Sequence, residues 1–202
     1  VMMAVILHGM TALQLLPGPG ETVGATLVAD PRIAGVLFTG STDVARQIAR
    51  ALAPRADDPV LVAETGGLNA LIADSSALPE QVVADAIASA FDSAGQRCSA
   101  LRILCVQDDV AACIVPMLRG AMAELRVGDP RRLDTDVGPV IDAQARDRIE
   151  AHIAAWRARG APVYQGALAP ECARGTFVAP TIIVVDDVRQ VTHEVFGPVL
   201  HV

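Results

Sequence analysis

Apolar runs and amphipathic segments alternate along the first third of the chain. Gly35–Phe38 and Pro59–Ala63 are short apolar runs typical of strands. Between them, Thr42–Leu52 has apolar residues four positions apart, which is the spacing of one helix face. Upstream, Ala12–Leu16 is β-like and Glu21–Ala29 has a helical pattern. This alternation predicts parallel strands joined by helical crossovers, and therefore an α/β fold.

The pair Gly66-Gly67 interrupts the alternation and marks a predicted boundary between two domains, residues 1–65 and 66–202. Beyond it the same alternation continues with longer helices. Helices are expected at Pro79–Ser93, Asp109–Leu125 and Asp142–Arg159. Strands are expected at Asn69–Ala73, Leu101–Val106, Pro162–Tyr164, Pro180–Val184 and Pro198–Val202, with a loop at Gly128–Gly138.

Composition narrows the class of protein. The 202 residues are 52% apolar, which is enough for one large or two small domains with a hydrophobic core. No apolar run reaches the roughly 18 uncharged residues of a membrane span, and no basic leader precedes the apolar start. The net charge of −7 and the 3% of aromatic residues disfavour nucleic acid as a partner. We therefore expect a cytoplasmic protein without a membrane span.

The cysteines lack the spacing of a metal site. None of Cys98, Cys105, Cys113 and Cys172 forms a C-x-x-C pair, and the histidines do not cluster with them along the sequence. No metal site and no disulfide framework are expected, and the thiols are expected to be reduced.

Two glycine-bearing turns precede predicted helices. Gly18, Gly20 and Gly24 come close to a dinucleotide fingerprint, but the last spacing is one residue too long, so a tight turn before a helix is favoured. In Phe38-Thr39-Gly40-Ser41-Thr42 a strand leads into a helix whose exposed N–H groups would suit an anion. Ser41 or Thr42 would equally serve as a plain helix N-cap.

Three further segments carry candidate chemistry. Glu64 ends a predicted strand before two glycines and is either a general base or a surface carboxylate, with equal weight. Cys98 follows Gly95-Gln96-Arg97 in a predicted loop, where a thiolate nucleophile and an inert packed thiol are the two interpretations. In His193–Pro198 a carboxylate and Phe196 flank a turn, which by itself indicates only a loop cap and a core side chain.

The order and spacing of these segments resemble the aldehyde dehydrogenase superfamily. F-T-G-S-T, E-T-G-G, G-Q-R-C-S and E-V-F-G-P-V follow one another in that family's order, and the resemblance covers essentially the whole chain. S-A-F-D-S-A-G-Q-R-C-S-A-L-R, G-D-P-R-R-L-D-T-D-V-G-P-V-I-D and H-E-V-F-G-P-V-L-H-V resemble one subgroup. It comprises the L-glutamate γ-semialdehyde dehydrogenase domains of bacterial bifunctional proline-utilisation flavoenzymes.

The resemblance implies a thiol mechanism. Cys98 would attack the aldehyde carbon to form a thiohemiacetal, and its own backbone N–H would help hold the oxyanion. Glu64 would activate the water that hydrolyses the later thioester. Ser99 resembles a residue that contacts the substrate carboxylate in this subgroup.

The resemblance also implies NAD as cofactor, with a partial Rossmann-type NAD-binding domain at 1–65 and an α/β catalytic domain at 66–202. Gly40 and Ser41 would lie against the pyrophosphate, Glu194 would bind the nicotinamide ribose, and Phe196 would flank the nicotinamide. FAD would belong to a separate proline dehydrogenase domain outside this chain.

The family's oxyanion-hole asparagine, its adenosine-ribose lysine, its substrate-anchoring loop and its oligomerisation segment would also lie outside the chain. The chain is therefore expected to be an internal fragment of a homo-oligomeric protein, with little dehydrogenase activity by itself. Three alternatives remain open: another aldehyde dehydrogenase, such as one for succinate semialdehyde; a thiol hydrolase or acyltransferase; and a non-catalytic fragment.

Overall fold

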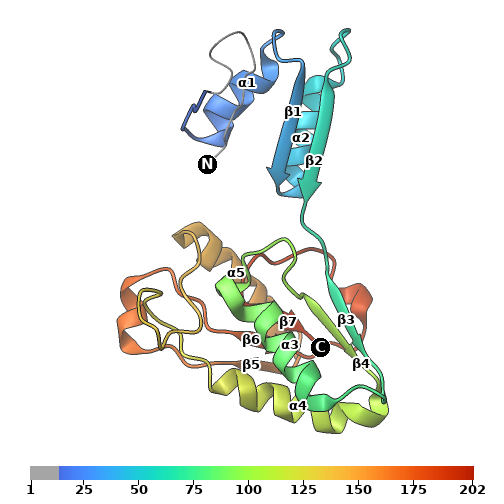
Figure 1. Cartoon of the computed structure of the whole chain (residues 1–202), viewed down its shortest axis with the longest axis vertical. Helices are drawn as coiled ribbons and strands as arrows, with labels where there is room; N and C mark the ends of the chain where they lie inside the picture. Colours follow the sequence, from blue (N-terminus) through green and yellow to red (C-terminus); the bar gives the residue numbers. More distant parts are fainter. Residues whose placement is uncertain (1–13) are drawn as a thin grey trace. The chain divides into compact units, whose positions relative to one another are not determined.

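The computed structural model describes residues 14–202, which form two compact units that meet in the sequence between Gly66 and Gly67 (Figure 1). This division falls one residue beyond the boundary expected from the glycine pair. The roles expected for the two parts, NAD binding and catalysis, stay predictions.

The first unit is built on a two-stranded parallel sheet. β1 (Gly35–Gly40) pairs with β2 (Val60–Thr65) in a register that runs from Gly35 opposite Val60 to Gly40 opposite Thr65. α2 (Thr42–Leu52) connects the two strands, as the four-residue apolar spacing predicts. A small apolar cluster lies between the sheet and the helices and consists of Val28, Ile48 and Leu52, with Val36, Phe38 and Leu61 against it.

The segment before β1 is helical, as expected, but begins unusually. Gly20–Gly24 forms one π-helical turn (η1) that continues into α1 (Ala25–Ala29). The strand expected at Ala12–Leu16 is wrong in its described part, because residues 14–16 have no regular structure and Leu15 is 65% exposed. Prolines at positions 17 and 19 remove two backbone donors there, which disfavours a strand. The first two residues of that expected strand, at positions 12 and 13, lie outside the described residues.

The second unit contains a five-stranded sheet in the order β3-β4-β7-β6-β5. All neighbouring strands are parallel except β5, which runs antiparallel to β6 at the sheet edge. The strands are β3 (Ala70–Ala73), β4 (Ile103–Val106), β5 (Val163–Gln165), β6 (Thr181–Ile183) and β7 (Val199–His201). The expected strands are therefore present, with bounds that differ by one or two residues from their apolar runs.

Three longer helices pack on this sheet: α3 (Pro79–Phe91), α4 (Asp108–Ala123) and α5 (Ala143–Ala158). α3 begins at Pro79, where the missing N–H costs no helical hydrogen bond. Asp142 caps α5 by accepting the amide N–H of Ala145 at 2.7 Å. The core between helices and sheet is closed by fully buried side chains that include Ile114, Leu118, Ile153, Ile182 and Leu200. Short 3-10 turns follow at Asp92–Gly95, Pro170–Arg174 and Val188–Gln190.

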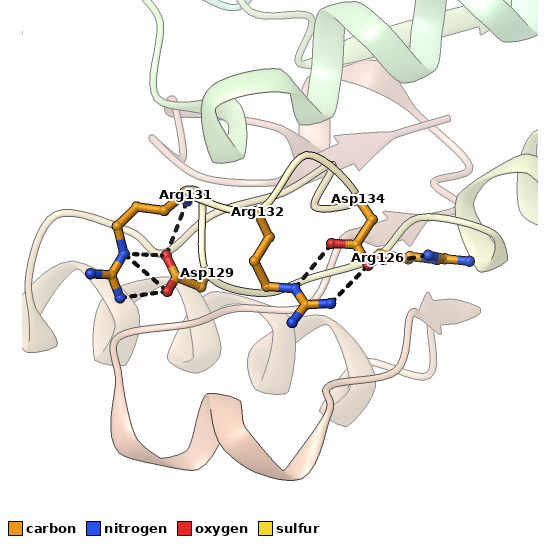
Figure 2. A network of polar contacts seen from close by, with 5 residues as sticks. All are labelled: Arg126, Asp129, Arg131, Arg132 and Asp134. Carbon is orange, nitrogen blue, oxygen red and sulfur yellow. Dashed lines mark hydrogen bonds and ion pairs between the residues drawn. The ribbon is translucent and has the colours of Figure 1, made fainter.

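The loop expected at Gly128–Gly138 connects α4 to α5 and carries a network of exposed ion pairs (Figure 2). Arg131 pairs with Asp129 at 2.6 Å, and Arg132 pairs with Asp134 at 3.0 Å. The Arg131 guanidinium lowers the pKa of Asp129 to about 2. Because these side chains are largely exposed, water and salt screen the pairs, and they add little to the stability of the loop.

Candidate active site

Cys98 occupies an exposed turn between α3 and β4. The turn is closed by a hydrogen bond from the amide of Ala100 to the carbonyl of Arg97 at 3.1 Å, so Cys98 and Ser99 lie at its two central positions. Both residues are exposed, which leaves the thiol accessible to a substrate. This exposure contradicts the interpretation of Cys98 as a packed thiol, while its role as a nucleophile stays a prediction.

The chain reaches this turn through a strained segment. The helix expected to run to Ser93 ends at Phe91, because Ser93, Ala94 and Gly95 have left-handed backbones with φ of 57°, 53° and 66°. A left-handed conformation costs an L-residue about 1–2 kcal/mol. Gly95 has a further reason to be glycine, since a Cβ there would lie 2.2 Å from the carbonyl oxygen of Gly197. The segment before Cys98 therefore packs closely, at Gly95, against Gly197 in the segment that also contains Glu194 and Phe196.

Two amide side chains to which no role was assigned hold the Cys98 turn and the segment before it. Asn69 Nδ2 donates to the carbonyl oxygens of Cys98 and Ala100 at 2.7 and 3.0 Å. Gln96 Nε2 donates to the carbonyl of Ser93 at 3.1 Å, while its Oε1 accepts the amide of Ile141 at 2.8 Å. Both are polar side chains close to glycines in the sequence, a position that favours turns and gives no signal of long-range contact.

Glu194 is connected to this turn through a buried arginine. Its Oε1 is paired with Nη2 of Arg102 at 2.9 Å, and its side chain is 18% exposed. Both hydrogen bonds from Arg102 go to Oε1, so Oε2 is free to accept a hydrogen bond from the hydroxyl of a ligand. The ring of Phe196 is 48% exposed and lies 5.5 Å from the Arg102 guanidinium carbon, so it is no core side chain. The interpretation of Phe196 as a core residue is therefore wrong.

Glu64, Gly40 and Ser41 lie in the first unit. Glu64 is exposed in β2 opposite Thr39. Ser41 is the N-cap of α2, with its Oγ accepting the amide of Val44 at 3.3 Å, as one interpretation of the sequence expected. Gly40 immediately precedes that cap and is exposed. These three residues present a carboxylate and the start of an eleven-residue helix at the carboxyl ends of the two strands.

The remaining cysteines differ from Cys98 in their surroundings. Cys172 is buried and its Sγ lies 3.5 Å from the carbonyl of Val127, while Cys105 is half-buried in β4. Cys113 is exposed on α4, 3.7 Å from the sulfur of Met117. All four cysteines are free.

Three histidines gather beside β7, although His152 is far from the other two in the sequence. His201 is 2% exposed, and its Nε2 lies 3.1 Å from Nε2 of His152, which also accepts the indole N–H of Trp156 at 3.0 Å. The ring of His193 lies 5.6 Å from that of His152. Burial lowers the pKa of both His201 and His152 to about 4. Between residues 14 and 202 no group of three histidine, cysteine or acidic residues is arranged to hold a metal ion.

Comparison with known proteins connects this geometry to a family. A model of the aldehyde dehydrogenase family matches residues 9–202. The bifunctional protein PutA of Salmonella typhimurium is 60% identical over 199 residues, and the chain spans 15% of its length. A 1-pyrroline-5-carboxylate dehydrogenase of Bacillus mycoides is 34% identical over 93% of the chain and 37% of the relative.

Solved structures agree with this comparison. The crystal structure of a variant of Bradyrhizobium japonicum proline utilization A superposes with a TM-score of 0.90 and is 52% identical. The match covers 95% of this chain and 19% of that one. The α/β fold described above is therefore the fold of the matched part of that protein. No described helix is long and apolar enough to cross a membrane.

Proposed function

Because the chain belongs to the aldehyde dehydrogenase family, we propose that it carries the thiol centre for NAD-dependent oxidation of L-glutamate γ-semialdehyde to L-glutamate. The observation that carries this proposal is Cys98, exposed in a turn that Asn69 and Arg102 fix from both sides. The names of the relatives support the substrate, since they are PutA proteins and 1-pyrroline-5-carboxylate dehydrogenases. L-Glutamate γ-semialdehyde is the aldehyde formed when pyrroline-5-carboxylate is hydrolysed.

In the proposed reaction the Cys98 thiolate adds to the aldehyde carbon and forms a thiohemiacetal. The backbone N–H of Cys98 then helps hold the oxyanion. NAD, when bound, supplies the acceptor for the hydride that leaves this carbon. Glu64 takes a proton from water as the water attacks the resulting thioester, which releases the carboxylate product and the thiol.

The residues of the chain offer the kinds of groups that bind a dinucleotide: free helix amides, a carboxylate oxygen and an exposed aromatic ring. The first amides of α2 follow Gly40 and have no partner inside the helix beyond the one that Ser41 caps, which suits a phosphate oxygen. Glu194 Oε2 can accept a ribose hydroxyl, and the exposed face of Phe196 can pack against a flat apolar ring. In this proposal residues 1–65 belong to the NAD-binding domain and residues 66–202 to the catalytic domain.

The substrate and the setting are parts of the same proposal. Ser99 follows Cys98 in the exposed turn, where its hydroxyl is available to a substrate carboxylate. We place the reaction in the cytoplasm and in a homo-oligomeric protein, with any FAD confined to a separate proline dehydrogenase domain. No metal takes part in the proposed reaction.

The first test compares two exposed thiols of the same chain. Cys98 and Cys113 are both accessible, so accessibility alone predicts similar rates of alkylation by iodoacetamide. We expect Cys98 to react at least tenfold faster, measured by mass spectrometry of labelled peptides. Equal rates would contradict an activated nucleophile and would favour a non-catalytic role.

The second test uses a longer protein that contains this sequence together with the segments its relatives carry. Cys98→Ala should abolish NADH formation from pyrroline-5-carboxylate while leaving thermal unfolding nearly unchanged, because Cys98 is exposed. Glu64→Gln should allow a burst of NADH and then slow turnover, because the thioester forms but hydrolyses slowly.

Faster turnover of succinate semialdehyde would indicate another aldehyde dehydrogenase, and thioester hydrolysis without NAD would indicate a hydrolase. The 202-residue chain alone is expected to form little NADH.

A further inference from the structure

Arg102 is a charged residue that is buried in the second unit. It immediately precedes β4 and is 1% exposed. A buried cation is costly unless it is paired and its donors are bonded. Arg102 meets this condition, because all three of its guanidinium nitrogens donate hydrogen bonds.

The first set of hydrogen bonds connects Arg102 to residues Glu194–Gly197, which directly follow His193. Nε and Nη2 of Arg102 donate to Glu194 Oε1 at 3.2 and 2.9 Å. Nη1 donates to the carbonyl oxygen of Gly197 at 3.1 Å. The guanidinium also lies 5.5 Å from the ring centroid of Phe196. One side chain thus contacts three of the four residues from Glu194 to Gly197.

The second set reaches the turn that carries the nucleophile. Nη2 of Arg102 also donates to the carbonyl oxygen of Arg97 at 3.1 Å. The same carbonyl accepts the amide of Ala100 and closes the turn around Cys98. Arg102 is therefore bonded at once to the acceptor that shapes the Cys98 turn and to Glu194, 92 positions later in the chain.

The arrangement requires the planar fork of arginine. Its three nitrogens hold three acceptors that lie in different directions, the Glu194 carboxylate and the carbonyls of Arg97 and Gly197. A lysine in this position would offer one ammonium group, which satisfies the charge of Glu194 but does not span the two carbonyls. The contact of Gly95 with Gly197 joins the same two segments by packing alone, without fixing the Glu194 side chain.

We propose that Arg102 is a positioning residue that fixes the Cys98 turn and the Glu194 carboxylate relative to each other. The role assigned to Glu194 rests on the proposed function, whereas the coupling between the two segments rests on geometry alone. Arg102 does not touch the reacting atoms; it acts through the residues that it holds. Disturbing either end of this bridge should therefore loosen the other end.

Two backbone amides report on the bridge without any ligand. The amide of Ala100 donates to the Arg97 carbonyl, and the amide of Val199 donates to the Gly197 carbonyl at 2.8 Å. Both carbonyls are held by Arg102. Hydrogen exchange at these two amides measures the local opening of each segment, and amides of β6 in the core give the reference for global opening.

The experiment measures this exchange by NMR in the wild-type chain, Arg102→Met, Arg102→Lys and Glu194→Ala. We expect exchange at Ala100 and Val199, relative to β6, to rise at least tenfold in Arg102→Met and to stay raised in Arg102→Lys. Glu194→Ala should accelerate exchange at Ala100 by at least threefold, although the Ala100 amide is bonded to Arg97 and the Glu194 side chain to Arg102. In the double variant with Arg102→Met, the loss of Glu194 should add nothing further.

Leu118→Ala is the matched control, because it removes a fully buried side chain on α4 and lowers stability without removing any hydrogen bond of either segment. It should accelerate exchange at β6 as much as at Ala100 and Val199. The proposal is overturned if Arg102→Met behaves like Leu118→Ala, if lysine restores wild-type exchange, or if Glu194→Ala leaves Ala100 unchanged. If Arg102→Met does not fold, Arg102→Lys and Glu194→Ala decide alone. None of these outcomes depends on dehydrogenase activity, so they are separate from a failure of the proposed function.

Discussion

Asn69 and Cys98 are joined by a hydrogen bond of 2.7 Å between the Asn69 side-chain amide and the Cys98 carbonyl oxygen, across 29 positions of the chain. The same amide also bonds the Ala100 carbonyl, and the backbone carbonyl of Asn69 accepts the amides of Arg102 and Ile103. Asn69 therefore connects the turn that contains Cys98 to the start of β3. Together with Arg102 it holds the carbonyl acceptors around Cys98 from two directions.

Removing this amide should destabilise the second unit. Asn69→Ala leaves the carbonyls of Cys98 and Ala100 without their donor, so we expect the free energy of unfolding to fall by about 1–3 kcal/mol. Asn69→Asp should cost more at neutral pH, because a carboxylate oxygen would then face two carbonyl oxygens. Urea unfolding followed by the fluorescence of Trp156 measures both changes. Equal stability of Asn69→Asp and the wild type would show that the two bonds do not form in solution.

Alanine substitutions at three glycines of the second unit distinguish the cost of backbone strain from the cost of a steric clash. Gly95→Ala meets both, since φ is +66° and a Cβ would lie 2.2 Å from the Gly197 carbonyl oxygen, so a loss above about 3 kcal/mol is expected. Gly160→Ala meets only the positive φ of +84°, and we expect a loss of about 1 kcal/mol. Gly120→Ala lies inside α4 with open space around it and should stabilise by about 0.5–1 kcal/mol. The midpoint temperature of thermal unfolding should therefore be lowest for Gly95→Ala, higher for Gly160→Ala and highest for Gly120→Ala.

The regular elements could be predicted because their apolar spacing is local. Thr42–Leu52 was expected and found as a helix with the same bounds, since its buried residues recur at helical spacing and Ser41 provides a cap. Ala12–Leu16 shows the limit of the same reasoning, because an apolar run forms a strand only where a neighbouring strand accepts its backbone bonds. The prolines that follow it disfavour such pairing.

The sequence motifs indicated candidate residues, but they did not indicate the side chains that hold those residues in place. The G-Q-R-C-S segment indicated Cys98, but nothing local indicates that Asn69 reaches its carbonyl, because the partners are 29 residues apart. Arg102 did give a signal, since a lone charge beside the apolar run of β4 must find partners if it is buried. The left-handed backbones of Ser93 and Ala94 gave none, because neither residue type favours that conformation.

Ser41 allows capping of α2 to be separated from binding of a phosphate. Ser41→Ala removes the bond to the amide of Val44 and should lower the free energy of unfolding of the first unit by about 1 kcal/mol. Ser41→Asp keeps a capping oxygen, so stability should stay near that of the wild type. The added negative charge should nevertheless weaken NAD binding at least tenfold in a longer protein that contains this sequence, as measured by calorimetry. Unchanged NAD affinity in Ser41→Asp would remove this helix start from the proposed pyrophosphate site.

The buried histidines should make the second unit sensitive to mild acid. Burial lowers the pKa of His201 to about 4 from an ordinary value of 6.5, and the neighbouring charges of His193 and Arg102 act in the same direction, whereas the carbonyl of Arg102 opposes it. His152, which faces His201, His193 and Arg159, is lowered to about the same value. A folded protein with these values binds fewer protons than the unfolded chain between pH 4 and 6.5.

Stability from these groups is therefore fully present above pH 6.5 and is lost as the pH falls from 6.5 to 4. For His201, which is almost completely buried, the loss should reach about 2–3 kcal/mol. The free energy of unfolding, measured by urea at pH values from 4 to 8, should fall with a slope that approaches two protons. In His201→Gln, which carries no titratable ring, the slope should drop by about one proton. A slope that is identical in the two proteins would contradict a lowered pKa of His201 in the folded protein.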